Sequence, residues 1–88
     1  MAEHDATFYW LIERMPTPPG ARPMYWSGSE NRIIKRASGI SVTFNPLAAR
    51  RVPHTAEDLA IDIAAALNAA YPLPDGQIWV SVEHGFIS

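Results

Sequence analysis

The chain has 88 residues and a formal net charge of −2, and 48% of its residues are hydrophobic while 18% are charged. This size and composition fit one folded domain over residues 1–88 and exclude a disordered chain. Because the sequence contains no cysteine, it excludes disulfides and thiolate metal sites and favours a cytoplasmic location. The apolar run Phe8–Ile12 is too short for a signal peptide core or a membrane span.

The first part of the sequence predicts two strands separated by a loop. Residues 1–5 are expected to form a loose end. Thr7–Glu13 is rich in β-branched and aromatic residues, which is typical of a strand. A segment with four prolines, residues 15–23, predicts a loop before a short second strand at Met24–Ser27. The polar, basic stretch at residues 28–38 is either a long loop or an extra short strand.

Two further strands and a short helix are predicted around the main helix. Apolar and polar residues alternate over Gly39–Phe44, which predicts a third strand. Asn45 is a preferred helix N-cap and Pro46 is suited to the first helical position, so a short helix is expected over Pro46–Arg50. A final alternating strand is expected over Gln77–His84.

The principal helix is predicted over Thr55–Ala70. Thr55 is followed three residues later by Asp58, which resembles an N-cap with a capping box. The apolar residues of this segment recur at helical spacing and predict a buried stripe of Leu59, Ile63, Ala66, Leu67 and Ala70. Ile61 is expected on the opposite side with Ala64 and Ala65. There it is either a small protein contact or one isolated exposed apolar residue.

These elements predict an α+β fold of the order β-β-β-(short α)-α-β. We expect a mainly antiparallel sheet of three or four strands with the principal helix packed on one face. The more apolar face is assigned to the helix side and comprises Phe8, Trp10, Ile12, Met24, Trp26, Ile40, Val42, Phe44, Ile78, Val80 and Val82. The other face is expected to carry Tyr9, Leu11, Tyr25, Ser41, Thr43, Trp79 and Ser81.

The sequence contains no recognisable catalytic or metal-binding motif. Its histidines, His4, His54 and His84, lack metal-ligand spacing. Asp58 and Asp62 are one helical turn apart, where they complement the helix dipole more readily than they form an acid/base pair. Neither a nucleophile elbow nor a glycine-rich phosphate loop is present. We therefore expect a protein that is not an enzyme and that holds no cofactor and no metal.

The charges are unevenly distributed along the chain. Residues 32–51 hold five basic residues and no acidic one, whereas residues 52–88 hold five acidic residues and no Lys or Arg. The two segments either neutralise each other across the fold or mark an interaction surface. Basic residues beside sheet aromatics are typical of single-stranded nucleic-acid binding. This alternative function would use Arg32, Lys35, Arg36, Arg50 and Arg51.

Several stretches together resemble small uncharacterised proteins of bacteriophages and prophages. They are Tyr9–Arg14 (YWLIER), Tyr25-Trp26, Asn45-Pro46-x-x-Ala49, the helix start Thr55-x-Glu57-Asp58-Leu59, and Val82-Glu83-His84. The chain departs from that pattern in its basic insert at residues 28–38 and lacks a tryptophan before Asn45. The resemblance implies a phage-type accessory protein in the bacterial cytoplasm and transfers no catalytic residues.

The leading functional prediction is a protein–protein interaction module without a cofactor. The expected partner is a host or phage protein, no membrane contact is expected, and a homodimer could form through an uncovered sheet edge or the Ile61 side. Tyr and Trp are frequent hot-spot residues at protein interfaces. The predicted binding residues are Tyr9, Tyr25, Trp79 and Ile61.

Overall fold

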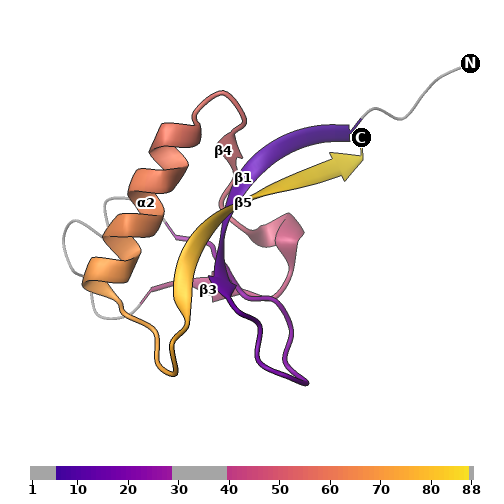
Figure 1. The fold of residues 1–88 in the computed structure, drawn as a ribbon. Coiled ribbons are helices and arrows are strands. Elements are labelled where there is room, and N and C mark those ends of the chain that lie inside the picture. The colour runs from indigo at the N-terminus through magenta and orange to yellow at the C-terminus, as the bar shows by residue number, and fades with distance from the viewer. Residues whose placement is uncertain (1–5, 29–39, 88) are drawn as a thin grey trace, which may run out of the picture.

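The computed structural model describes residues 6–28 and 40–87 and has the predicted α+β architecture, with one long helix packed on an antiparallel sheet (Figure 1). The strands are β1 (Ala6–Met15), β2 (Tyr25–Trp26), β3 (Val42–Thr43), β4 (Val52–Pro53) and β5 (Ile78–Ile87). The helices are η1 (Pro46–Ala48), a single 3₁₀ turn, and α2 (Glu57–Ala70). The possible extra strand and the basic loop at residues 28–38 lie, apart from Gly28, outside the described residues.

β1 is the central strand of the sheet. β5 pairs with it along ten residues, from Ala6↔Ile87 to Met15↔Ile78. The opposite edge of β1 is shared, because Trp10 pairs with Val52 of β4 and Glu13 pairs with Tyr25 of β2. β3 adds to β2, so the sheet has five strands where the sequence predicted three or four. The additional strand is β4, which lies in the segment expected only to lead into the helix.

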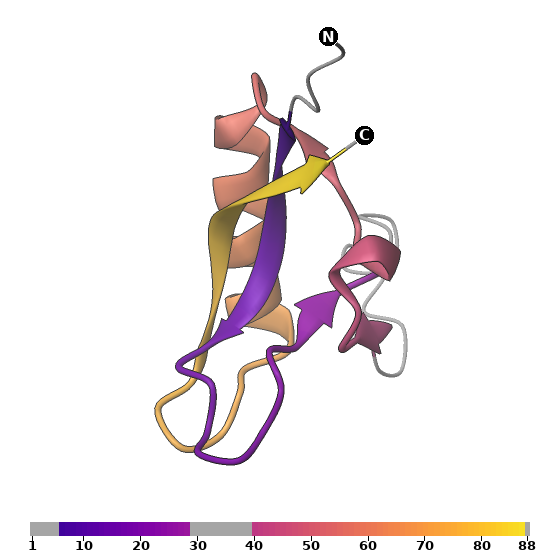
Figure 2. The ribbon, with the colours of Figure 1, turned by 90° about the vertical axis from the view of Figure 1, so that its right-hand side faces the viewer.

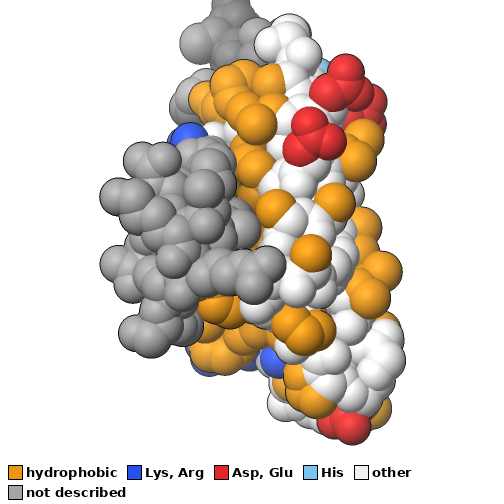
Figure 3. Space-filling model, turned by 90° about the vertical axis from the view of Figure 1, so that its left-hand side faces the viewer, with side chains coloured by type: hydrophobic (Ala, Val, Ile, Leu, Met, Phe, Trp, Pro, Cys, Tyr) orange, Lys and Arg blue, Asp and Glu red, His pale blue; other side chains and the backbone are white. Residues whose placement is uncertain are grey.

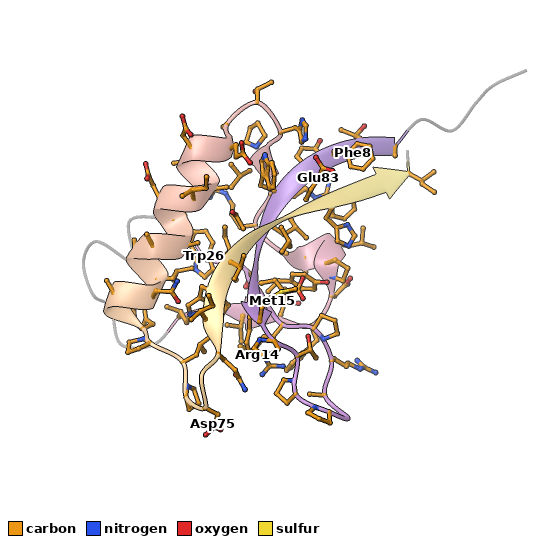
Figure 4. The ribbon with its side chains drawn as sticks, in the orientation of Figure 1. Phe8, Arg14, Met15, Trp26, Asp75 and Glu83 are labelled. Atoms are coloured by element: carbon orange, nitrogen blue, oxygen red, sulfur yellow. The ribbon has the colours of Figure 1, made fainter. Side chains whose placement is uncertain are left out.

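The main core lies between α2 and the sheet. Its buried members come from four strands and the helix: Ile12, Trp26, Val52, Ala60, Ile63, Ala64, Leu67 and Trp79. Figure 4 shows Trp26 between α2 and the strands. The polar atoms of two tryptophans are bonded, because the Trp79 indole N–H donates to the Tyr71 carbonyl at 3.2 Å and the Trp10 indole N–H donates to the His54 carbonyl at 2.9 Å. Burial of the core therefore leaves these indole donors paired.

The start of the helix differs from the prediction. α2 begins at Glu57, its N-cap is Ala56, and no side chain caps it, so the Thr55 capping box is not formed. The chain instead leaves β4 through a tight turn in which the Ala56 N–H donates to the Pro53 carbonyl at 2.8 Å. The pairing of β4 with β1 fixes this turn and places Thr55 before the cap position.

The buried stripe of α2 is also rotated from the predicted one. Leu59 is exposed, whereas Ala60 and Ala64 are buried with the predicted Ile63 and Leu67. Ala64, expected on the outer side with Ile61, is thus a core residue. Small alanine side chains suit this position because they let the helix approach the large tryptophans of the sheet, which belong to the same core cluster.

β5 presents its other face to the helix. Cross-strand partners share a face, and Ile12, which is buried in the helix-side core, pairs with Ser81. Trp79 therefore points toward α2 and is only 1% exposed, while Ile78, Val80 and Val82 lie on the opposite face. The prediction for this strand was wrong because it assigned the more regular apolar alternation of Ile78, Val80 and Val82 to the helix side, whereas α2 covers the single large indole of Trp79.

Three more residues assigned to the buried face, Phe8, Val42 and Phe44, are exposed. Phe8 is 46% exposed near the end of β1 that curves away from α2 (Figure 1), and Val42 and Phe44 are 40% and 52% exposed. The cap of η1 is as predicted: the Asn45 side-chain oxygen accepts from the Leu47 N–H at 3.0 Å and Pro46 occupies the first turn. The helix is shorter than expected, since it ends at Ala48.

Candidate functional site

The sheet face opposite α2 carries a row of aromatic side chains. Alternation along β1 and β5 places Tyr9, His84 and Phe86 there, and β2 adds Tyr25. Tyr9 and Phe86 meet edge to face at 5.8 Å between ring centroids, and Phe86 lies 4.8 Å from His84. His84 in turn meets Tyr25 at 6.3 Å and 86°. The rings form one continuous contact row across three strands.

Arg51 lies over this row. Its guanidinium carbon is 4.3 Å from the centroid of the Phe86 ring and 5.5 Å from that of Tyr9, which are cation–π distances. The position of Arg51 follows from its neighbours, because Val52 pairs with Trp10 and the Arg50 N–H donates to the Trp26 carbonyl at 3.1 Å. We call the surface formed by Tyr9, Tyr25, Arg51, His84 and Phe86 the Tyr9 face.

A second, smaller core supports the Tyr9 face from below. Leu11, Tyr25 and Ala49 are buried there, and Val82 and Phe86 pack against them. Tyr25 is only 6% exposed, so it acts mainly as a support, while Tyr9, His84 and Phe86 are half-buried and Arg51 is exposed. Figure 2 looks toward this side and shows the β1–β5 ribbon in front with η1 beside it.

A carboxyl group lies at one end of the row. Glu13 is the cross-strand partner of Tyr25 and is half-buried. Burial raises the pKa of Glu13 above its ordinary value of 4.5, and the nearby His84 lowers this pKa in part. Burial also raises the pKa of Tyr25, and the charge of Glu13 adds to that rise. The Tyr9 face thus has a cation at one end and a partly desolvated carboxyl group at the other.

The four residues predicted to bind a protein do not form one surface. Tyr9 and Tyr25 share the face opposite α2, but Trp79 is buried between the sheet and α2, so its predicted place on an open face is wrong. Ile61 is 48% exposed on the outer side of α2, as expected. Figure 3 shows acidic side chains gathered at the start of the helix, where Glu57 and Asp58 occupy the first turn, and hydrophobic side chains along the rest of this face.

The residues of the nucleic-acid alternative are only partly described. Arg51 lies on the Tyr9 face, and the backbone of Arg50 is bonded to β2. Arg32, Lys35 and Arg36 lie outside the described residues. One of the five basic residues is therefore placed beside stackable aromatic rings.

The sequence analysis named Arg51 as a candidate residue but missed Phe86, on which Arg51 stacks. The predicted last strand ended at His84, although the residues after Gly85 continue the alternation and pair with Thr7 and Ala6. Phe8 covers that glycine: a Cβ at Gly85 would stand 2.8 Å from the Phe8 Cε1 atom. The alternation of Val82, His84 and Phe86 was the available signal for a longer strand.

A separate polar contact lies at the same end of the sheet on the helix side. The His54 Nε2 atom is 2.5 Å from the Glu83 carboxylate, and the imidazole stacks parallel to the Trp10 indole at 5.6 Å and 2°. Figure 4 shows Glu83 and Phe8 together on this end of the ribbon. Since both members of the pair are about half exposed, water screens the contact and its contribution to stability is small.

Within residues 6–28 and 40–87, no three His, Asp or Glu side chains are grouped closely enough to hold a metal ion, and no pocket is present. None of the helices in that part of the chain has the length and apolar character needed to cross a membrane. The chain matches no protein-family model, no curated protein and no solved structure. The resemblance to phage and prophage proteins therefore stays a prediction.

Proposed function

We propose that the protein is a binding module that acts by protein–protein contact through the Tyr9 face rather than by catalysis. The observation that carries this proposal is the guanidinium of Arg51 stacked on Phe86 and Tyr9 at one end of a row of aromatic rings. Tyr, Phe and Arg are enriched at protein interfaces, and the two aromatic residues bury a large area while ordering few rotatable bonds.

The chemistry of the face favours a partner segment that is both apolar and acidic. The rings of Tyr9 and Phe86 offer contact area, and Arg51 offers guanidinium N–H donors that suit a carboxylate. Stacking already orients the guanidinium, so less side-chain entropy is lost when it binds. The resemblance to phage and prophage proteins supports an accessory role toward a host or phage protein, and the cysteine-free sequence supports a cytoplasmic setting.

The test is capture of binding partners by variants that differ only in this face. A tagged chain is used to recover proteins from host lysate after nuclease treatment, beside the variants Arg51→Ala and Tyr9→Ala. Ile61→Ala is the matched control, because Ile61 is exposed on the outer side of α2. We expect a stoichiometric protein that both Tyr9-face variants lose by at least about tenfold, which is 1.4 kcal/mol, and that the control retains. Equal recovery by all four folded proteins would contradict the proposal.

A second candidate function is single-stranded nucleic-acid binding, and one observation favours it. Arg51 stands beside Tyr9 and Phe86, and base stacking on aromatic rings next to a cation is typical of such binding. This function predicts that a single-stranded oligonucleotide binds in a fluorescence anisotropy titration and that the affinity falls steeply as salt is raised, since phosphate contacts release counterions. Binding that is absent at low salt would exclude it.

A further inference from the structure

The outer edge of β5 exposes backbone groups that have no partner in the described structure. The hydrogen bonds of Asn68 show which backbone groups of β5 point outward. The Asn68 Oδ1 atom accepts from the Trp79 backbone N–H at 2.7 Å, and its Nδ2 atom donates to the Trp79 carbonyl at 2.9 Å. The backbone groups of Trp79 therefore point away from β1. Because this orientation alternates along an antiparallel strand, the N–H and C=O groups of Ser81, Glu83, Gly85 and Ile87 also point outward.

Asn68 takes the place of a neighbouring strand at Trp79 and at that residue only. Within residues 6–28 and 40–87, no hydrogen bond reaches the outward backbone groups from Ser81 to Ile87. In the described sheet β5 pairs with β1 alone, while β2 and β4 pair with the opposite edge of β1. The edge is thus closed where α2 approaches it and open over its C-terminal part.

This open stretch lacks the features that usually prevent strands from pairing. Edge strands are commonly protected by Lys, Pro or a bulge. β5 contains no Lys, Arg or Pro, and its ten register pairs with β1 follow without interruption. Its one acidic side chain, Glu83, is paired with His54. The exposed apolar residues Phe8 and Ile87, the latter 76% exposed, lie at the same end of the ribbon.

We propose that this edge pairs with the same edge of a second copy of the chain, antiparallel about a two-fold axis, so that two sheets join into one. A strand is self-complementary in this arrangement, since every outward N–H meets an outward C=O of its twin. The axis passes beside His84, which sets Ser81 opposite Ile87 of the second copy and Glu83 opposite Gly85 of the second copy. An axis at Glu83 would place two carboxylates face to face, which is unfavourable.

Analytical ultracentrifugation over a concentration series tests the pairing. We expect the wild-type chain, of 9.7 kDa, to sediment at twice that mass and to dissociate on dilution. Glu83→Pro removes an outward N–H that β1 does not use, and it should give the single-chain mass throughout. Glu83→Ala is the matched control, because it loses the same carboxylate but keeps the N–H, and it should remain a dimer.

A second measurement decides the matter if Glu83→Pro does not fold. Amide hydrogen exchange of the wild-type chain should show protected Ser81, Glu83, Gly85 and Ile87 amides at high concentration, and this protection should be lost on dilution. A wild type that stays monomeric at millimolar concentration overturns the proposal, as does a dimer in which these amides exchange freely. So does a monomer that becomes protected only when a different protein is added. The Tyr9-face variants leave the edge intact, so this result is independent of the proposed function.

Discussion

The two faces of the sheet differ in how completely their side chains are covered. On the helix side, α2 closes over Trp26 and Trp79, and the indole N–H of Trp79 and its backbone groups all find partners in Tyr71 and Asn68. Below the Tyr9 face, the described part of the chain forms a small core of Leu11, Tyr25 and Ala49, and Tyr9, His84 and Phe86 remain half-buried beside an exposed arginine. The first face supplies most of the buried area, while the second leaves contact area available to a partner.

This contrast explains where a mutation should affect folding and where it should affect binding. Buried apolar area is the main favourable term in folding, and truncation of a buried side chain adds the cost of a cavity. A half-buried aromatic on an open face contributes less to folding because water still reaches it.

The largest expected effect is that of Trp79→Ala. Loss of the indole from the core should lower the free energy of unfolding by about 3–5 kcal/mol, while Tyr9→Ala should cost about 1 kcal/mol. Urea unfolding followed by circular dichroism measures both, and Trp79→Phe provides a variant that retains part of the packing. Equal losses for Trp79→Ala and Tyr9→Ala would contradict the assignment of the two faces.

The next effect concerns the amide that closes the β5 edge. Asn68→Ala leaves the N–H and C=O of Trp79 without their partners, and part-buried groups that lose hydrogen bonds cost about 1–3 kcal/mol. Ile61→Ala, on the outer side of the same helix, should change stability by no more than about 0.5 kcal/mol. Thermal unfolding of both variants separates the hydrogen bonds from any change in helix propensity, since both introduce alanine.

The sequence was sufficient for elements with a long, regular pattern. The first strand, the last strand and the principal helix were predicted. In the strands, aromatic and β-branched residues extend over many positions, and in the helix the apolar residues recur at helical spacing. The alternation also placed Tyr9 and Tyr25 on the face opposite the helix, which the structure confirms. The pattern that predicts these positions lies within one short stretch of sequence, so it can be recognised without knowledge of the fold.

The parts that failed depend on contacts between distant segments. Two residues of β4 carry no periodic signal, yet their pairing with β1 sets the turn that excludes Thr55 from the cap. The face of β5 is decided by burial of Trp79 under α2 and by Asn68, eleven positions earlier in the chain. Arg51 joins the site only because β4 brings it over Phe86. Residue spacing and composition do not predict which distant segments pair or which side chain a helix covers.

The caps of the two helices give a third, smaller comparison. Asn45→Ala removes the side-chain oxygen that accepts from the Leu47 N–H, so it should cost about 0.5–2 kcal/mol. Thr55→Ala should stay within about 0.5 kcal/mol, because Thr55 does not cap α2. Denaturant titrations of the two variants check this difference. A loss for Thr55 that matches the loss for Asn45 would mean that α2 begins earlier than Glu57.

The smallest effect is a pH dependence that belongs to the Tyr9 face. Burial raises the pKa of Glu13 above 4.5, so the folded chain holds this proton more tightly than the unfolded chain does. The free energy of unfolding therefore contains a contribution that is complete below the unfolded pKa and is lost as the pH rises through the folded pKa. Above that pH window the partly buried, ionised carboxylate slightly lowers the free energy of unfolding, and its attraction to His84 reduces this loss.

Glu13→Gln removes the titration and keeps nearly the same volume. We expect the variant to be slightly more stable than the wild type at neutral pH and to lose that advantage as the pH is lowered toward the unfolded pKa of Glu13. Urea unfolding of both proteins from about pH 4 to about pH 8 gives the difference curve, in which the titrations of groups that do not interact with Glu13 cancel. Parallel curves would mean that Glu13 is solvated as well in the folded chain as in the unfolded chain. The carboxyl end of the Tyr9 face would then be as open to water as the Arg51 end.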